Sequence, residues 1–432
     1  MRERESRTTR STGPIGRDGT GLSGDLRPRT PPMSAGPAPL RVLVAHNRYQ
    51  VRGGEDAAVA RDLAALEQAG CAVEAVFLDN DAIASGLDRL RAAVGATHAP
   101  EGIARVMAAA RRFAPDVIHV HNFFPLLSPG IHAAARSAGC ATVQTLHNYR
   151  LVCANAFLMR DGAPCELCVA GSPYRAVRFA CYRGSRIGSL AVARMIDHHR
   201  RAGTWRRDVD RFIALTPFAR ERFVEAGFPA DKIRIRPNGL PDPGPSGDGA
   251  RQGLLYVGRL SPEKGLIVLA EAAARAGLRV TVIGEGPLAS ALTGHPGLDL
   301  KGALPPDAVQ AAMARASALV VPSLWYEGLP MVVAEAFAAG TPVVASRIGA
   351  LAGLVAEGTS GLLAEPGDAA DLASALGRIA GDPAAAAAMG REARAVYERE
   401  WREDVTTRAL LEIYRDAVAA RAADIPLTRT GT

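Results

Sequence analysis

The stretch 254–265, LLYVGRLSPEKG, places an apolar, β-rich run directly before a helix start. Its first residues are typical of a strand that is buried on both faces of a sheet. Ser261 and Pro262 are typical of a helix N-cap and of the first helical position. A strand that passes through a short loop into a helix is the repeating unit of α/β folds.

The same unit recurs on both sides of this stretch. The predicted strands of the first half are 41–45, 73–78, 117–121, 142–146, 212–215 and 233–235. Those of the second half are 254–257, 280–283, 298–301, 319–321, 343–345 and 362–364. Helix-period stretches separate most of them, which predicts two doubly wound α/β halves with parallel sheets.

Segments of unusual composition suggest the domain boundaries. Residues 1–38 are rich in Arg, Gly, Ser, Thr and Pro, which predicts a disordered basic tail, or an upstream extension if translation starts at Met33. The turn-rich stretch 237–250 is typical of a linker. We therefore expect one domain at 39–240, with an insertion at about 150–185, and a second domain at 241–400. The helical end, 401–424, is a candidate to cross back to the first domain.

Composition excludes several protein classes. Of the 432 residues, 48% are apolar, 22% charged and 5% aromatic, which is typical of globular and not of disordered or fibrous proteins. No run reaches the roughly 18 apolar residues of a membrane span, and the N-terminus lacks the apolar core of a secretory signal. The sequence thus predicts a cytoplasmic protein. Its net charge of +7 equals the surplus of ten Arg over three Asp within 174–211.

Three strands of the first half end in the same dipeptide, His followed by Asn. The pairs are His46 and Asn47, His121 and Asn122, and His147 and Asn148. A single His at a strand end can simply cap backbone groups. Three of nine histidines in equivalent places instead favour a polar cleft, because ligands bind beyond the carboxyl ends of parallel strands.

Glycines and cations mark candidate anion sites. Gly53 and Gly54 precede a predicted helix start, where backbone N–H groups can bind an anion. The pattern is not GxGxxG, which argues against a nicotinamide dehydrogenase. Arg259 and Lys264 flank another helix start, and Lys264 is expected in its first turn, where the helix dipole disfavours a cation by roughly 0.3–1 kcal/mol. A diphosphate between them would explain the pair, and a solvated loop is the alternative.

The segment 323–346, SLWYEGLPMVVAEAFAAGTPVVAS, carries two carboxylates. Glu335 falls in a helix that is apolar on every side, so we expect the helix to be buried and Glu335 to meet a buried cation or the hydroxyls of a ribose. Glu327 precedes Gly328, Leu329 and Pro330, whose helix start offers free N–H groups.

These motifs, with GRLSPEKG, IGEGP (283–287) and PNG (237–239), resemble those of the retaining nucleotide-sugar glycosyltransferases of sequence family 4. The resemblance extends from residue 40 to about 420. It implies a GT-B fold, in which two Rossmann-like doubly wound domains face a central cleft. The second domain would hold the nucleotide sugar and the first domain the acceptor.

The resemblance also implies roles for individual residues. Arg259 and Lys264 would neutralise the donor diphosphate, Glu335 would bind the ribose, Glu327 the sugar hydroxyls near C3 and C4, and His121 would lie near the transferred sugar. The further donor-side candidates are Gly53, Gly54, Gly258, Gly284, Glu285, Gly286, Gly328, Leu329 and Pro330. The acceptor-side candidates are His46, Asn47, His147 and Asn148. The family usually has Phe-Gly where this chain has Leu329 and Pro330, which leaves the donor open.

The implied reaction is metal-independent at the diphosphate and needs no catalytic cofactor. It would transfer a sugar with retained configuration from a nucleotide sugar to a glycan or lipid-linked acceptor, with bacterial surface polysaccharide as the expected product. The alternatives are a nucleotide-sugar epimerase or hydrolase of the same fold and a degenerate scaffold. The intact Arg259, Lys264, Glu327 and Glu335 argue against the scaffold.

Four of the six cysteines fall in one segment: Cys153, Cys165, Cys168 and Cys181. The C-x-x-C pair with single cysteines on either side predicts a structural zinc site, with free thiols and a redox pair as alternatives. Because the segment follows the strand that ends at His147, we expect it to form part of the acceptor wall.

The basic stretch follows the cysteines. Ile187, Leu190, Ala191 and Met195 have helical spacing, and seven arginines flank them: Arg183, Arg186, Arg194, Arg200, Arg201, Arg206 and Arg207. The pattern fits a core-facing helix with a solvated basic face, or attachment to an anionic membrane near a lipid-linked acceptor. Nucleic acid is not an expected partner, because no aromatic residues interleave the arginines.

Overall fold

The computed structural model describes residues 39–48, 53–80, 95–244 and 251–424. The predicted tail and the alternative start at Met33 lie outside the described residues. Pro39–Thr432 forms one compact unit, so the predicted boundaries at residues 240 and 400 stay predictions.

The first half contains a six-stranded parallel sheet in the order β2-β1-β3-β4-β7-β8. Its strands are β1 (Arg41–Arg48), β2 (Ala72–Asp79), β3 (Val117–Val120), β4 (Ala141–Leu146), β7 (Arg211–Ala214) and β8 (Ile233–Ile235). The strand order reverses at β1, because β2 is added on one side of β1 and β3 on the other. In doubly wound sheets ligands bind at this switch point.

The second half contains another six-stranded parallel sheet, in the order β11-β10-β9-β12-β13-β14. Its strands are β9 (Leu254–Val257), β10 (Val280–Ile283), β11 (Leu298–Leu300), β12 (Ala318–Val321), β13 (Val343–Ser346) and β14 (Gly361–Ala364). This is the Rossmann order, and its switch point lies between β9 and β12. The prediction of two doubly wound halves is confirmed.

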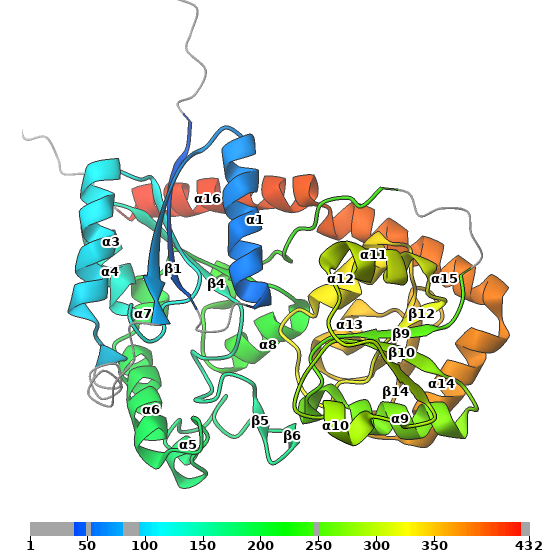
Figure 1. The fold of residues 1–432 in the computed structure, drawn as a ribbon. Coiled ribbons are helices and arrows are strands. Elements are labelled where there is room, and N and C mark those ends of the chain that lie inside the picture. Colours follow the sequence, from blue (N-terminus) through cyan, green and yellow to red (C-terminus); the bar gives the residue numbers. More distant parts are fainter. Residues whose placement is uncertain (1–38, 49–52, 81–94, 245–250, 425–432) are drawn as a thin grey trace, which may run out of the picture. The chain divides into compact units, whose positions relative to one another are not determined.

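Helices cover both faces of each sheet, because the strands direct apolar side chains to both faces. In the first half these helices are α1 (Gly54–Gln68), α3 (Pro100–Phe113), α4 (Gly130–Ser137), α6 (Arg186–Arg201), α7 (Thr204–Arg207) and α8 (Pro217–Glu225). Leu43 and Ala45 of β1 pack in the core with α3 and α4, whereas Val42 and Val44 pack in the core with α1. Figure 1 shows α3 and α4 on one side of these strands and α1 on the other.

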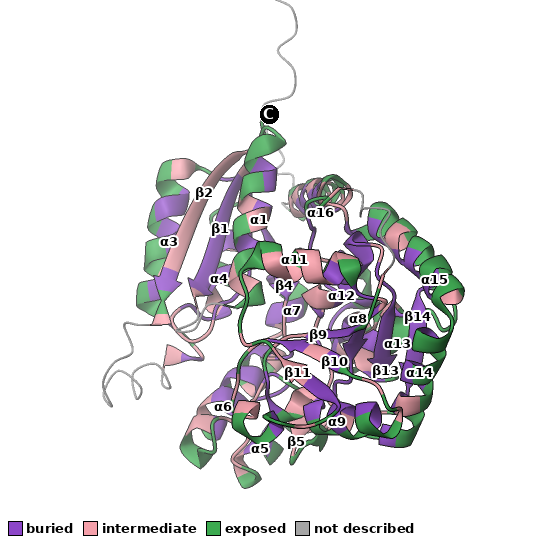
Figure 2. Cartoon of the chain, turned by 45° about the vertical axis from the view of Figure 1, so that its right-hand side comes forward, coloured by how far each residue is buried: buried purple, intermediate pink, exposed green. Residues whose placement is uncertain are grey.

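The second sheet is covered in the same way. Its helices are α9 (Leu266–Arg275), α10 (Ala289–Leu292), α11 (Pro306–Arg315), α12 (Met331–Ala338), α13 (Gly349–Leu354), α14 (Ala369–Gly381) and α15 (Pro383–Val396). Leu254 and Tyr256 pack with α9 and α14, and Leu255 packs with α12. In Figure 2 the strands are mainly buried, while α14 and α15 carry exposed residues on their outer faces.

The final helix, α16 (Glu403–Ala423), belongs to the core of the first half. Its residues Leu410, Ile413, Tyr414 and Ala417 pack with β1, β3 and β4. A buried ion pair lies close by, in which the Arg236 guanidinium donates to both Asp62 carboxylate oxygens at 2.7 and 2.9 Å and to the Thr406 carbonyl at 3.1 Å.

The insertion has a fold that the sequence did not predict. A two-stranded antiparallel hairpin of β5 (Met159–Arg160) and β6 (Ala163–Pro164) precedes Cys165, and the short helix α5 (Arg175–Arg178) precedes Cys181. Strands of two residues are too short to give an alternating apolar pattern, so sequence periodicity could not reveal them. Among the described residues, no helix combines the length and the apolar content that crossing a bilayer requires.

Candidate active site

Three histidines lie together at the carboxyl ends of neighbouring strands in the first half. His46 lies near the end of β1, His121 follows β3, and His147 follows β4. The Nδ1 atom of His121 lies 2.9 Å from Nε2 of His147, and the two rings stack with their centroids 5.2 Å apart. The ring of His46 meets that of His121 edge-on at 6.2 Å. The strand order therefore assembles the histidine cluster that the sequence predicts.

Burial keeps these imidazoles uncharged near neutral pH. It lowers the pKa of His121 well below the ordinary value, and the neighbouring His119, His147 and His46 lower it further. Burial also lowers the pKa of His147 to about 3. The Nε2 atom of His121 is buried without a hydrogen-bond partner among the described residues. A neutral imidazole with an open ring nitrogen can bond a sugar hydroxyl.

The asparagines that follow these histidines stabilise loops. Asn47 is fully buried, and its Oδ1 accepts a hydrogen bond from the Leu126 N–H at 3.2 Å. Asn122 donates to the carbonyl of Asn47 at 2.8 Å. Asn148 Oδ1 accepts from the Arg150 N–H at 3.0 Å. The asparagines therefore bond backbone groups, and His46 does so as well, because its Nδ1 accepts from the Asn122 N–H at 3.4 Å.

Asp56 links the glycine turn before α1 to the histidine cluster. The Gly53 N–H donates to Asp56 Oδ2 at 3.1 Å, and Asp56 Oδ1 lies 3.0 Å from His46 Nε2. A Cβ atom on Gly53 or Gly54 would meet no described atom within 4 Å. Residues 49–52, which precede this turn, lie outside the described residues. The first turn of α1 carries Glu55 and Asp56, so anion binding at this helix start stays a prediction.

A charged cluster lies beyond β9 and β12, at the switch point of the second sheet. Lys264 Nζ donates to Glu327 Oε1 at 2.7 Å, and the Ser323 hydroxyl donates to the same oxygen at 2.7 Å. Glu327 is only 6% exposed, so these two bonds offset the cost of burying its charge. Arg259, on the loop after β9, is exposed.

The local structure around Lys264 corrects the prediction for this residue. Ser261 and Pro262 begin a 3₁₀ turn, Pro262–Lys264, and the α-helix α9 starts only at Leu266. Gly265 separates them with a φ of 72°, and a Cβ there would collide with the carbonyl oxygen of Pro322. Lys264 is therefore not in the first turn of an α-helix. Its ion pair with Glu327 replaces the unfavourable dipole interaction that was expected.

The glycines of the motifs GRL and IGEGP bring two strand-end loops together. A Cβ on Gly284 would collide with the carbonyl oxygen of Gly258, and a Cβ on Gly286 would collide with the backbone of Leu260. Leu260 N–H donates to the carbonyl of Glu285 at 2.9 Å. These donor-side candidates thus shape the loop that presents Arg259, and the side chain of Glu285 is exposed.

The loop after β12 touches the histidine cluster. A Cβ on Gly328 would lie 2.8 Å from the carbonyl oxygen of His147, so glycine is needed for this close approach. Glu327 precedes this contact, and Leu329 and Pro330 lead from it into α12, with Pro330 as the N-cap. The contact brings the charged cluster and the histidine cluster to one place.

Glu335 differs from the prediction. The helix α12 is buried at Val333, Ala334, Ala336, Phe337 and Ala338, but the side chain of Glu335 is exposed. Partial burial of its carboxyl raises the pKa, and the charge of Arg61 opposes this shift. The prediction of a helix buried on every side is wrong, because one face with Glu335 is open. An open carboxylate can reach ribose hydroxyls.

The four cysteines of the insertion form no disulfide bonds in the structure. Cys153 is buried, and its Sγ lies 2.9 Å from Asn155 Oδ1. Burial raises the pKa of Cys168 to about 11, and the charges of Cys153, Cys181 and Cys165 add to the shift. Among the described residues, no three or more His, Cys, Asp or Glu side chains are grouped as they would be around a metal ion. Zinc binding stays a prediction.

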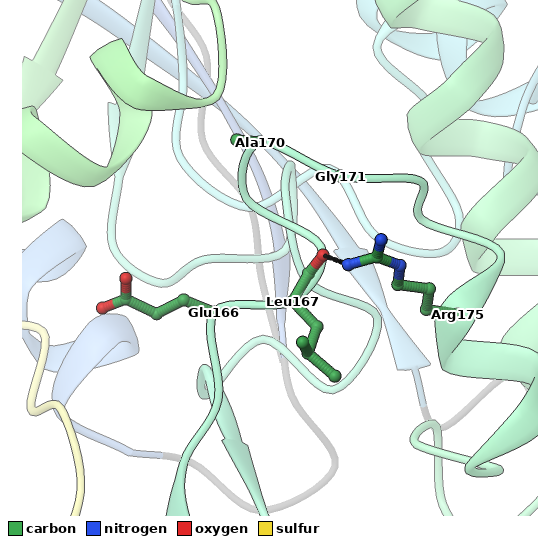
Figure 3. Close-up of a pocket in the computed structure, with 5 residues that line it drawn as sticks. All are labelled: Glu166, Leu167, Ala170, Gly171 and Arg175. Carbon is green, nitrogen blue, oxygen red and sulfur yellow. Dashed lines mark hydrogen bonds between the residues drawn. The ribbon is translucent and has the colours of Figure 1, made fainter.

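Two surface recesses lie away from both clusters. A shallow recess of about 470 Å³ in the insertion is lined by Glu166, Leu167, Ala170, Gly171 and Arg175 (Figure 3). A second recess, of about 480 Å³, is lined in part by Asp242, Arg251 and Arg394. Neither contains the histidines, Lys264 or Glu327. The candidate active site is thus defined by its side-chain contacts and not by either of these recesses.

Family models match both halves of the chain. Residues 53–239 match the glycosyl transferase 4-like domain, and residues 251–382 match glycosyl transferases group 1. A 2-deoxystreptamine glucosyltransferase of Streptomyces kanamyceticus is 31% identical over 310 residues, which are 68% of this chain and 74% of that protein. The chain belongs to the glycosyl transferases group 1 family.

Further comparisons agree with this family and with the GT-B fold. A D-inositol 3-phosphate glycosyltransferase of Acidothermus cellulolyticus is 34% identical over 247 residues, which are 49% of this chain. The matched part of this chain spans about half (54%) of the length of that relative. The sucrose-phosphate synthase of Thermosynechococcus elongatus superposes with a TM-score of 0.65 at 20% identity, over 88% of this chain and all of that one. The structure of Anabaena HepE in complex with UDP superposes with a TM-score of 0.59 at 18% identity, over 86% of this chain and 98% of that one. At these identities the two structures show the fold alone.

Sequence reasoning missed Asp56, Ser323 and the two aromatic residues Trp325 and Tyr326. Asp56 stands three residues after the N-cap Gly53, which is where an acidic residue completes a helix start, so this signal was present. Ser323 lies two residues after the end of β12 at the switch point, a position that favours ligand-side residues.

Proposed function

We propose that this protein is a glycosyltransferase that moves a sugar from a nucleotide-sugar donor to a glycan or lipid-linked acceptor with retained anomeric configuration. One observation carries the proposal. The cluster of Lys264, Glu327 and Ser323 at one switch point meets the histidines at the other through the contact of Gly328 with His147.

The donor is assigned to the second half. Lys264 and the exposed Arg259 supply two positive charges near the loops at the switch point, where a diphosphate leaving group needs its charge stabilised. Glu335 is open to solvent and would accept from both hydroxyls of a ribose. Glu327 is held by Lys264 and would bind hydroxyls of the sugar. Two cations and the helix starts can stabilise the leaving diphosphate, which is our reason to propose a reaction without a metal at this position.

The transfer exchanges one C–O bond for another at the anomeric carbon. The bond from C1 to the diphosphate oxygen breaks, and a bond from C1 to the acceptor oxygen forms on the same face of the sugar. The acceptor proton passes to an oxygen of the leaving diphosphate. His121 would bond a sugar hydroxyl through its Nε2, which is buried without a partner among the described residues, and would remain uncharged, because burial lowers its pKa.

Screening nucleotide sugars tests the proposal. A ligand at about 100 times its Kd stabilises the fold by about 2.7 kcal/mol, so a true donor should raise Tm. The selected donor is then incubated with and without glycan acceptors. Transfer of the sugar to an acceptor, with the anomeric configuration kept in the product, supports the proposal. Release of free sugar at the same rate without any acceptor would favour the epimerase or hydrolase alternative.

The insertion and α6 support a lipid-linked acceptor at an anionic membrane on the cytoplasmic side, as in bacterial surface polysaccharide synthesis. Among the described residues, six of the nine exposed large apolar side chains fall here: Phe157, Leu167, Tyr174, Phe179, Ile187 and Leu190. Exposed arginines accompany them: Arg175, Arg178, Arg183, Arg186 and Arg194. Exposed apolar side chains with cations around them are what an interfacial membrane surface requires. Met195 is buried, so α6 also packs on the core, as the alternative expects.

We also propose a structural zinc ion in the insertion and none in catalysis. The C-x-x-C pair follows the hairpin β5–β6, and the other three thiols contribute, after burial, to the raised pKa of Cys168. Zinc binding would require the thiols to draw together. Protein purified under reducing conditions without added metal should contain close to one zinc per chain, and less in Cys165→Ser. Zinc-free protein with the same Tm would favour free thiols.

A further inference from the structure

The loop that carries Glu327 is held by side chains from the insertion and from α8. The Trp325 ring meets Phe157 of the insertion edge-on, with the ring centroids 5.0 Å apart. The Tyr326 ring meets Phe218 of α8 at 4.7 Å. Aromatic pairs in this geometry add about 0.5–1.5 kcal/mol beyond the burial of their area. The two residues before Glu327 are therefore both held by partners outside the second sheet.

Glu166 joins the same contacts from within the C-x-x-C turn. Its carboxylate accepts a hydrogen bond from Arg222 of α8 at 2.7 Å. Burial raises the pKa of the Tyr326 phenol to about 12, and the nearby Glu166 carboxylate adds to this shift. Figure 3 shows the Glu166 carboxylate pointing away from Arg175, which bonds the carbonyl of Leu167 instead. Glu166 thus lies between α8 and the loop that leads to Glu327.

These contacts leave the loop little freedom. A Cβ on Gly349 would lie 2.8 Å from the Tyr326 ring, so the start of α13 closes one side of that ring. On the other aromatic residue, Lys264 Nζ lies 5.3 Å from the Trp325 ring centroid, and the same ammonium bonds Glu327. An unbroken series of contacts therefore leads from Phe157 through Trp325 and Lys264 to the carboxylate.

We propose that Glu166, acting through Tyr326, and Phe157, acting through Trp325, are positioning residues for Glu327. This inference rests on the proposed transferase function. The insertion, which we assign to the acceptor side, thereby sets the geometry of a donor-side carboxylate. Positioning within a fraction of an ångström is what such contacts supply, since a small misplacement of a group that binds the reacting sugar slows transfer more than it weakens ground-state binding.

Substitutions where Tyr326 lies beside Glu166 test the proposal. Tyr326→Phe and Glu166→Ala should each lower kcat about tenfold, while the Kd for the nucleoside diphosphate stays within about twofold. The double variant should be no slower than either single variant, because both remove the same contact. Glu166→Gln should recover most of kcat, since its amide oxygen can still accept from Arg222. Phe157→Ala should give a smaller loss of the same kind.

Glu225→Ala is the matched control, because Glu225 also pairs with Arg222, at 2.6 Å, yet lies on α8 in the first half. It should leave kcat unchanged. A loss equal to that of Glu166→Ala, or additive losses in the double variant, would overturn the proposal.

Hydrogen exchange gives a readout that does not depend on transfer. Amides of residues 324–329 should exchange faster in Glu166→Ala and Tyr326→Phe than in the wild type or Glu225→Ala, with equal Tm. Unchanged exchange would overturn the positioning role. A wild-type protein that transfers no sugar would instead overturn the proposed function, and the exchange result would still decide whether Glu166 holds the loop.

Discussion

The two switch points of this protein are built from opposite chemistry. In the first half, the strand ends present His46, His121 and His147, whose pKa values burial lowers. In the second half, the corresponding ends present a lysine, an arginine and a carboxylate, with Lys264 and Glu327 paired at 2.7 Å. The imidazoles of the first site are uncharged near neutral pH, with the Asp56 carboxylate 3.0 Å from His46, whereas the second site carries charges of both signs.

This difference teaches that equivalent positions of one fold can serve two partners. A leaving diphosphate needs positive charge that is already in place, which the second half supplies. An acceptor alcohol and a sugar ring carry no charge, and neutral imidazoles can bond their hydroxyls without an electrostatic cost. We therefore assign the diphosphate to the charged switch point and hydroxyl recognition to the uncharged one.

Removing charge from the second switch point should give the largest effect. Lys264→Ala and Glu327→Ala should each lower kcat by at least two decades, which is about 2.7 kcal/mol in the barrier. Steady-state kinetics with a saturating donor measure this loss. Lys301→Ala is the control, since Lys301 is exposed and pairs only with Asp299 among the described residues.

The folding of these variants has to be checked separately. Lys264→Ala leaves the buried Glu327 with Ser323 as its remaining partner in this cluster, which destabilises the loop. A circular dichroism spectrum and a Tm close to the wild type would show that the fold is intact. Near-normal turnover in both variants would contradict the assignment of the charged switch point.

Much of this comparison could be predicted from the sequence, because it depends on which residues directly follow strands. The apolar runs gave the strands of both sheets, and their ends gave His121, His147, Arg259 and Lys264. The sequence did not predict that the side chain of Glu335 is exposed, because eight apolar neighbours cannot show which face of a short helix is covered. The aromatic contacts of Trp325 and Tyr326 were missed for another reason. Their partners are 168 and 108 residues distant in sequence, and no local pattern records such pairing.

Vesicle binding extends the comparison to the outer surface of the first half. Each Arg near an anionic leaflet contributes about 1 kcal/mol, and the attraction decays over a Debye length of about 8 Å. Replacing Arg183, Arg186 and Arg194 by Gln should therefore weaken binding to anionic vesicles by roughly two decades. Sedimentation at low and physiological salt measures it, and binding should fall as salt rises.

The control replaces three exposed arginines of the second half, Arg275, Arg279 and Arg391, by Gln. The net charge changes equally, so binding should stay close to that of the wild type if the surface on α6 is responsible. Equal losses in both triple variants would mean that total charge and not this surface binds the membrane. A wild type that ignores anionic vesicles at low salt would remove the support for a lipid-linked acceptor.

The uncharged state of the histidines should appear in the pH dependence of stability. The pKa of His147 is lowered to about 3, so the unfolded chain binds a proton that the folded chain does not between about pH 6.5 and 3. The contribution of the neutral His147 to the free energy of unfolding is complete above pH 6.5 and is lost as the pH falls toward 3. The loss is at most about 1.4 kcal/mol per pH unit for each such group. His147→Gln should flatten this slope in urea unfolding at pH 7, 6 and 5. His198→Gln, at an exposed position of α6, should not.

Calorimetric titration of a nucleoside diphosphate tests the central claim most directly, because it separates the two switch points without requiring an acceptor. UDP, or whichever nucleoside diphosphate the donor screen selects, is titrated into the wild type, Lys264→Gln and His121→Ala. The account predicts at least about a hundredfold weaker binding in Lys264→Gln, about 2.7 kcal/mol, and an affinity within about twofold of the wild type in His121→Ala. Undiminished binding in Lys264→Gln, or a comparable loss in His121→Ala, would contradict the assignment of the diphosphate to the second half.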